Sequence, residues 1–248
     1  ALPASALVWS LILHHCPSSC HIHQLQTFSG VPSGSFSAPD HEYLSYLELQ
    51  LMATDSGGLK DTKTVRLDPD TVSITLASIP SRLQVVFNGT SASTPFSRTV
   101  IRGSTNTIGA PSPQTLAGAQ YSFMAWSDGG AQNHNITANT SATYTATYSG
   151  PPVNVSKPTI SGEPREGKTL TATAGSWESA APVTFAYQWL RCDKQGANCV
   201  VVAGATSTTY ALTSGDVGSR LRVKVTATNS AGSSSAISDP TAPVKRAR

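Results

Sequence analysis

The sequence has little charge and no stretch long enough to cross a membrane as a helix. Aspartate, glutamate, lysine and arginine make up only 12% of the 248 residues. The basic residues form no stripe with interleaved aromatic side chains, so we expect no nucleic-acid partner. The apolar stretch 4–13 is shorter than the roughly 20 residues of a membrane span, and we expect no such span.

Catalytic motifs are also missing. The sequence contains no Gly-x-Ser-x-Gly nucleophile turn, so the presence of Ser, His and Asp does not indicate a hydrolase. No helical period of useful length occurs either. We therefore expect a protein that is not an enzyme and that has no catalytic residues of its own.

What is present is the period-two alternation of β-strands. Apolar residues alternate in Leu7–Leu13 and again in Leu221–Ala227, and Asn88-Gly89 is a strong hairpin signal. Turn residues recur at the spacing that β-sandwiches require. The sequence predicts an all-β fold of tandem small sandwich modules, with boundaries at 1–69, 70–149 and 153–245.

The first segment shows only three or four strands, too few to close a sandwich. The chain also begins without Met, inside a strand-like pattern. We expect a fragment of a longer protein, or a processed product, in which further strands precede the first segment.

The four cysteines form two close pairs, Cys16 with Cys20 and Cys192 with Cys199. Local, even pairing in a Ser/Thr-rich β-chain favours two disulfide-closed loops and an oxidising compartment. The pairs therefore predict an extracellular location, secreted or at the cell surface.

Three stretches of the first segment resemble the second half of a PKD-type β-sandwich: residues 9–23 (WSLILHHCPSSCHIH), 37–43 (SAPDHEY) and 49–59 (LQLMATDSGGL). The form they resemble is attached to secreted bacterial glucose/sorbosone dehydrogenase-like proteins of the quinone-cofactor type. Those enzymes carry catalysis on a separate β-propeller. The resemblance thus implies an accessory module and an upstream catalytic domain of the same parent chain.

The other two segments resemble bacterial β-modules. Residues 121–130 (YSFMAWSDGG) with 143–148 (TYTATY) are similar to a β-repeat of bacterial surface proteins. Residues 187–192 (YQWLRC), 216–218 (DVG) and 227–229 (ATN) resemble bacterial immunoglobulin-like repeats. This likeness implies an immunoglobulin-like last module in which Trp189 and Val223 occupy the core and no cysteine bridges the sheets.

Reactive chemistry is concentrated near the N-terminus, where five of the six histidines and two of the four cysteines fall within the first 41 residues. Imidazole, thiolate and carboxylate are the groups that bind transition metals. Three arrangements are open. In the first, the histidines are polar loop residues around a disulfide. In the second, a disulfide shapes the loop and the histidines bind a metal ion. In the third, both thiolates and two histidines form a structural zinc site, although the ligands are more closely spaced than in usual zinc sites. His21 and His23 lie on one face of a strand, and the metal arrangement adds His41, with His15 or Glu42.

Acidic loop residues offer a second, calcium-type site. Asp40 and Asp55, with Glu42 beside them, carry the oxygen ligands that calcium takes between tandem β-domains. The alternative is that Asp55, in the sequence Asp-Ser-Gly-Gly, only caps its own turn.

Two tryptophans are candidates for stacking on sugar rings, Trp126 and Trp177. The alternation around Trp126 instead favours a place in the core.

From these observations we expect a non-catalytic extracellular accessory region that acts as a spacer or binds a polysaccharide or cell-surface glycan weakly. It would need no cofactor beyond a metal ion at the histidines. The alternative is a metal-dependent redox function, with copper or zinc at that cluster.

Overall fold

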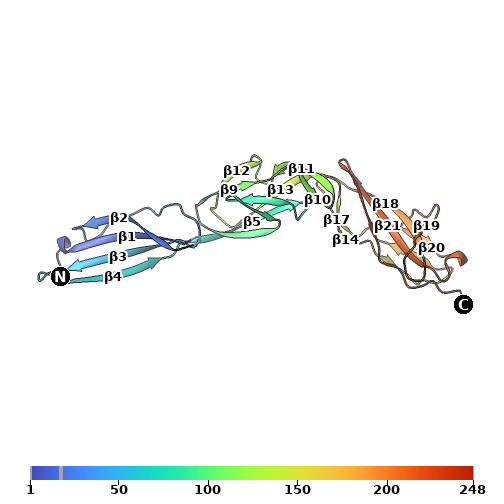
Figure 1. Cartoon of the computed structure of the whole chain (residues 1–248), viewed down its shortest axis with the longest axis horizontal. Helices are drawn as coiled ribbons and strands as arrows, with labels where there is room; N and C mark the ends of the chain where they lie inside the picture. The colour runs from blue at the N-terminus through green and yellow to red at the C-terminus, as the bar shows by residue number, and fades with distance from the viewer. Residues whose placement is uncertain (1, 17–18, 248) are drawn as a thin grey trace. The chain divides into compact units, whose positions relative to one another are not determined.

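The computed structural model describes residues 2–16 and 19–247 and contains only strands and two short 3-10 helices (Figure 1). Residues 1, 17, 18 and 248 lie outside the described residues, among them the middle of the loop between Cys16 and Cys20. Hydrogen-bonded sheets stay within three stretches of chain, 7–67, 71–149 and 153–237. Backbone contacts divide the chain into two compact units: Ala1–Leu76, Val86–Gly109 and Asn133–Tyr144 in one, Ala77–Val85, Ala110–Gln132 and Thr145–Arg248 in the other.

The first stretch folds into one four-stranded antiparallel sheet, preceded by the 3-10 helix η1 (Ala4–Ala6). Its order is β2-β1-β3-β4, so β2 and β4 are the edges (Figure 1). The strands are β1 (Leu7–His15), β2 (His21–Ser29), β3 (Tyr46–Thr54) and β4 (Lys60–Leu67).

The buried apolar side chains of this sheet lie on one of its faces. Leu11 and Leu13 of β1 are buried and lie on the same face, because alternate residues of a strand point the same way. The edge strands β2 and β4 are exposed along almost their whole length. A single sheet with one partly covered face agrees with the sequence, which shows too few strands here to close a sandwich.

The second stretch forms two antiparallel sheets, with orders β10-β11-β13-β5-β8 and β12-β9-β6-β7. Burial alternates along β5, where Val72, Ile74 and Leu76 point inward. Asn88 and Gly89 both have positive φ and form the predicted hairpin turn between β6 and β7. The strands are β5 (Thr71–Ile79), β6 (Gln84–Phe87), β7 (Thr90–Ser93), β8 (Phe96–Ile101), β9 (Thr105–Gly109), β10 (Gln114–Leu116), β11 (Ala119–Trp126), β12 (Asn133–Thr137) and β13 (Ala142–Ser149).

The third stretch builds its core around Trp189, which is fully buried with Leu170, Leu221 and Val223. Its sheets have the orders β14-β17, β15-β16-β20 and β19-β18-β21-β22. The elements are β14 (Val153–Ser156), β15 (Ile160–Ser161), β16 (Thr169–Ala172), β17 (Ser176–Glu178), β18 (Thr184–Cys192), β19 (Val200–Val201), β20 (Thr209–Ala211), η2 (Ser214–Asp216), β21 (Arg220–Asn229) and β22 (Gly232–Ile237). The chain is therefore an all-β protein of tandem small sandwich modules.

A buried carboxylate holds the turn that precedes β21. Asp216 is fully buried, and its oxygens accept hydrogen bonds from the Arg191 guanidinium at 2.7 Å, the Tyr210 hydroxyl at 3.0 Å, and the backbone and side chain of Thr213 at 2.8 and 2.9 Å. Burial by itself raises the pKa of Asp216, but the bonds from Thr213 and Arg191 outweigh that effect. The pKa therefore lies below its ordinary value, and the group is ionised at neutral pH.

No helix in the described part of the chain combines the length and the apolar character needed to cross a membrane.

The Asp216 network generates the first prediction. Asp216→Asn should destabilise the third segment by about 2–3 kcal/mol, because the partly exposed Arg191 and the donors of Tyr210 and Thr213 lose their charged acceptor. The stabilisation from a carboxylate with a lowered pKa is present above the unfolded value and is lost as the pH falls through the folded one. Wild-type stability should therefore fall in acid, and the variant should show less of that fall. Urea titrations at neutral and acidic pH, followed through the methyl NMR signals of Leu170 and Val223, measure both effects.

Asp239→Asn is the matched control. Asp239 is exposed and pairs with the exposed Lys157 at 2.7 Å, so its replacement should leave the urea midpoint nearly unchanged. Equal losses in the two variants would contradict a structural role for the buried network.

Candidate functional site

The histidines of the first sheet meet at the hairpin that joins β1 to β2. In the antiparallel register His15 lies opposite His21, and Leu13 lies opposite His23. His21 and His23 are two residues apart, so they share a face, and cross-strand pairing places His15 on the same face. Local strand geometry thus brings three imidazoles together without help from distant parts of the chain.

A disulfide closes this hairpin. Cys16 is bonded to Cys20, as predicted, and Cys192 is bonded to Cys199 at the end of β18. Because both sulfurs of the first pair are in the bridge, neither is a thiolate that could bind zinc. The structural zinc site with cysteine ligands is therefore excluded for this form of the protein.

The imidazoles lie within contact distance of one another. His15 Nδ1 is 3.1 Å from His21 Nε2. The potential ligand nitrogens of His15, His21 and His23 all lie within 4.8 Å of each other. The rings of His21 and His23 meet edge to face, with centroids 4.8 Å apart. His21 and His23 are exposed and His15 is partly buried, so the cluster opens to solvent.

A carboxylate holds the other side of His15. The Nε2 atom of His15 lies 2.9 Å from Glu42 Oε1, and His41 Nδ1 lies 3.1 Å from Glu42 Oε2. His41 and Glu42 come from the segment that leads into β3. The hydrogen bond from His15 is the largest of the effects that lower the pKa of Glu42 to about 2. Glu42 is therefore a carboxylate at neutral pH and only accepts hydrogen bonds.

His14 does not belong to the cluster, although it precedes His15 directly. Its ring stacks on Tyr46 of β3, with centroids 4.4 Å apart, and its Nε2 lies 3.2 Å from Glu48. Adjacent residues of a strand point to opposite faces. His14 therefore faces the other side of the sheet.

The ligand set differs in one respect from the predicted one. The sequence grouped His41 with His21 and His23, but the structure places His41 with His15 and Glu42. Among the described residues, His15 belongs both to the group with His21 and His23 and to the group with His41 and Glu42. The register of the hairpin, which pairs His15 with His21, is the signal that identifies it as the central residue.

The two aspartates of the predicted calcium site are not brought together. Asp55 follows β3 and Asp40 precedes it, and a nine-residue strand is about 30 Å long. Asp55 Oδ1 accepts hydrogen bonds from the backbone of Gly57 and Leu59, at 2.8 and 2.9 Å. Asp55 thus caps its own turn, which was the alternative to calcium binding.

The predicted stacking tryptophans pack inward. Trp126 is only 3% exposed, and its indole donates a hydrogen bond to the carbonyl of Gln132 at 3.1 Å. Trp177 is partly buried against the core of the third segment and donates to Ala174 at 2.8 Å. A ring as buried as that of Trp126 has no free face for a sugar, so the structure places it in the core.

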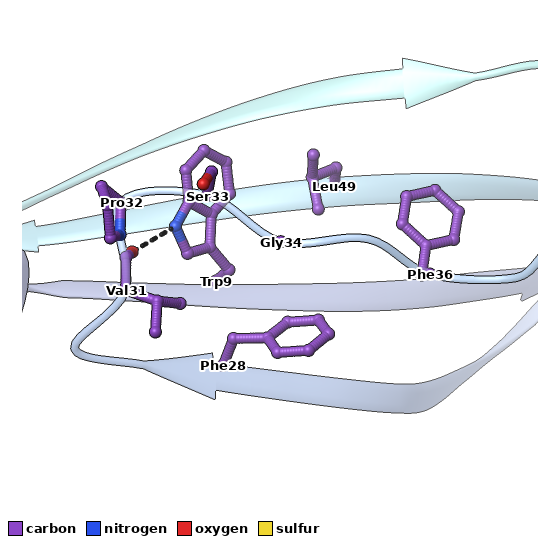
Figure 2. Close-up of a pocket in the computed structure, with 8 residues that line it drawn as sticks. All are labelled: Trp9, Phe28, Val31, Pro32, Ser33, Gly34, Phe36 and Leu49. Atoms are coloured by element: carbon purple, nitrogen blue, oxygen red, sulfur yellow. Dashed lines mark hydrogen bonds between the residues drawn. The ribbon is translucent and has the colours of Figure 1, made fainter.

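An aromatic hollow on the first sheet was not expected from the sequence. Figure 2 shows Trp9 and Leu49 on neighbouring strands, with the loop that carries Val31 and Gly34 crossing over them. The hollow has a volume of about 230 Å³, and Phe28 and Phe36 complete its walls. The Trp9 indole donates to the carbonyl of Val31 at 3.1 Å and so ties the loop to the sheet (Figure 2).

One motif of the third segment has the spacing of a phosphate-binding loop but not its structure. Gly162 and Gly167-Lys168-Thr169 are spaced as in Gly-x4-Gly-Lys-Thr. Such a loop needs a following helix whose N-terminal amides bind the phosphate. Here the loop joins two strands, β15 and β16, so the spacing does not indicate nucleotide binding.

Comparison with known proteins bears on the third segment. Residues 154–238 match the family described as the AIR9 A9 domain, IG_AIR9. The match begins in β14 and extends past the end of β22, so it covers the strands around Trp189 and Asp216. The last module is therefore immunoglobulin-like, as the sequence predicted.

Other comparisons add little. A crystal structure of domains A168–A170 from titin is 13% identical, covering 99% of this chain and 90% of that chain. Its TM-score is 0.27, a superposition too loose to carry an argument. No curated protein matches the chain. An immunoglobulin-like domain suggests a non-catalytic accessory module, and none of these matches supports the metal-dependent redox alternative.

The packing of Trp126 generates the second prediction. Trp126→Ala should destabilise the second segment by about 3–5 kcal/mol, the cost of removing a large buried ring. Met124→Ala, on the same strand but at a side chain that is 60% exposed, should change stability by less than about 0.5 kcal/mol. Urea titration followed through the Ile74 and Ile108 methyl signals gives both values. Unchanged stability in Trp126→Ala would show that the ring is not a core residue.

Proposed function

We propose that the chain is a non-catalytic extracellular accessory region that acts as a spacer for a catalytic or adhesive domain of the same parent protein. The observation that carries this proposal is the ordered linker between the second and third segments. A spacer sets a distance only when its junctions are held, because a flexible linker lets the modules it joins move independently.

The linker is held from both sides. The hydroxyl of Tyr121, in the second segment, donates to the carbonyl of Pro151 at 2.8 Å. Asn229, in the third segment, donates to the carbonyl of Gly150 at 2.8 Å. A Cβ atom on Gly150 would come within 2.2 Å of the Tyr121 ring, so only glycine allows this close approach.

A further hydrogen bond within the same compact unit spans the junction. The Glu178 carboxylate accepts a hydrogen bond from the backbone of Ser81 at 2.6 Å. Pro151 and Pro152 fix two backbone dihedral angles between the modules. Together these features favour a junction with little freedom of movement.

The location and the parent protein belong to the same proposal. Two local disulfides and a Ser/Thr-rich surface suit an oxidising extracellular compartment. The resemblance of the first segment to a PKD-type module favours a secreted bacterial protein, with a sugar dehydrogenase-like domain as the catalytic partner. The sequence of the gene on either side of this region would show how far that parent protein extends.

Weak binding of a glycan is the second candidate function. The aromatic hollow of the first sheet favours it, because Trp9, Phe28 and Phe36 offer the ring surface on which a sugar packs. Phe36 is the most accessible of these rings, with 38% of its surface exposed.

The spacer role predicts that the linker is protected. In the full chain, the amides of residues 149, 150, 153 and 154 and of the turn 229–232 should exchange slowly with deuterium; Pro151 and Pro152 have no amide hydrogen. The double variant Tyr121→Phe with Asn229→Ala removes both side-chain donors while it keeps the Tyr121 ring, so exchange at both places should accelerate at least tenfold. Hydrogen–deuterium exchange with peptide mass spectrometry measures this.

The matched control is Tyr187→Phe with Thr171→Ala, which removes one phenol hydroxyl and one other polar side chain of the third segment away from the linker. It should leave exchange at the linker unchanged. Fast exchange of the linker in the wild-type protein would argue for a flexible tether and against a spacer.

The glycan candidate is tested directly with a panel of polysaccharides and a glycan array. A spacer alone should bind none of them at millimolar concentration. Binding that is lost in Phe36→Ala but kept in Phe185→Ala, an exposed ring of the third segment, would favour the second candidate.

A further inference from the structure

The hydrogen-bonding partners of the clustered histidines determine which nitrogen of each ring carries a proton. Glu42 is an acceptor, so His15 must donate to it from Nε2. The backbone carbonyl of Ser19 is also an acceptor, and it lies 3.3 Å from His21 Nδ1, which must donate in turn. In a neutral imidazole the second nitrogen then has a free lone pair.

The two free lone pairs face each other. They belong to His15 Nδ1 and His21 Nε2, which are 3.1 Å apart. Two ring nitrogens this close need a proton or another cation between them, and a potential ligand nitrogen of His23 lies within 4.8 Å of both.

The spacing fits a metal ion. Two nitrogens bound at 2.0–2.1 Å to a tetrahedral ion are about 3.3 Å apart, close to the separation of the first two rings. His23 is exposed, so rotation of its side chain can bring the third nitrogen to the same distance. We propose that His15, His21 and His23 form a three-nitrogen site for a divalent transition-metal ion, copper or zinc.

Glu42 and His41 have a different role in this site. A metal-binding histidine almost always donates its other ring N–H to a carboxylate or carbonyl, which fixes the ring and the tautomer. Glu42 does this for His15, and Ser19 does it for His21. His41 holds the second oxygen of Glu42, so Glu42 and His41 are positioning residues and not ligands.

The donor set narrows the choice of ion. Neutral imidazoles favour copper and zinc over magnesium and calcium, which take oxygen ligands. Copper(II) binds a given nitrogen site more tightly than zinc does. Three protein ligands at an exposed site leave one coordination position for water or for a group of another molecule.

The test is metal titration of the full chain, produced without a polyhistidine tag and stripped with a chelator. Isothermal titration with zinc and with copper(II), checked by elemental analysis, should give one ion per chain, and copper should bind more tightly. His15→Ala, His21→Ala and His23→Ala should each weaken binding at least a hundredfold. The copper(II) spectrum in electron paramagnetic resonance should show three equatorial nitrogens.

His14→Ala is the matched control, because His14 is adjacent in sequence but faces the other side of the sheet. It should leave the affinity unchanged, as should His134→Ala in the second segment. Circular dichroism of each variant confirms that the strands are retained.

A second pair of variants tests the positioning role of Glu42. Glu42→Ala should weaken binding by about 10–100-fold, and Glu42→Gln should recover part of the loss, because its amide oxygen still accepts from His15. Neither should change the number of nitrogens in the copper spectrum.

Three results would overturn the proposal. The first is the absence of a stoichiometric ion, which would leave a shared proton as the cation between His15 and His21. The second is an equal loss of affinity in His14→Ala. The third is a loss in His41→Ala with His21→Ala and His23→Ala unaffected, which would move the ion to the group around Glu42.

Discussion

The register of the β1–β2 hairpin is the constraint on which the histidine cluster depends. Alternate residues of a strand face opposite sides, so a slip of one residue would exchange His14 for His15 at the cluster. Two buried leucines fix the orientation of β1. Leu11 and Leu13 lie on the same face as His15, and turning β1 over would move both of them into water. The hydrophobic effect therefore determines that His15, and not His14, faces the cluster.

The third segment holds its sheets together without a disulfide between them. Trp189 and Val223 fill the centre of its core, and the disulfide Cys192–Cys199 only closes a loop at the end of β18. The turn before β21 is fixed instead by the bonds to Asp216. A buried carboxylate costs free energy unless its lone pairs are satisfied. The four hydrogen bonds to Asp216 meet that condition, so the network defines one geometry for this corner.

Local patterns account for the features that the sequence predicted well. The Asn88-Gly89 hairpin, the two disulfides and the alternation of Leu221 to Ala227 all depend on residues close in the chain. One local pattern misleads. The alternation of Val65 and Leu67 predicts that both point inward, but Val65 is 58% exposed, because β4 is the edge of a single sheet with little to cover it. Alternation indicates which face a side chain takes and does not show whether that face is covered.

Long-range contacts explain what could not be predicted. His21 and His23 could be placed on one face from their spacing, but the position of His41 depends on how the segment between β2 and β3 returns to the hairpin. Asp40 and Asp55 were grouped by residue type alone, although the strand β3 that lies between them separates them along its length. The aromatic hollow has the same origin, since the loop that carries Phe36 closes over Trp9 from a distance in the chain.

The proposed ion also bears on the stability of the first sheet. Strand β2 is an exposed edge that buries almost no apolar surface, so hydrophobic packing contributes little to holding it. Its attachment depends on the backbone ladder to β1 and on the Cys16–Cys20 bridge. An ion bound by His15 of β1 and by His21 and His23 of β2 links the two strands directly. An ion that binds the folded hairpin and not the separated strands would stabilise the hairpin by about 2.7 kcal/mol at a concentration 100 times its Kd. The metal site would thus attach β2 to β1, which the hydrophobic core does not do.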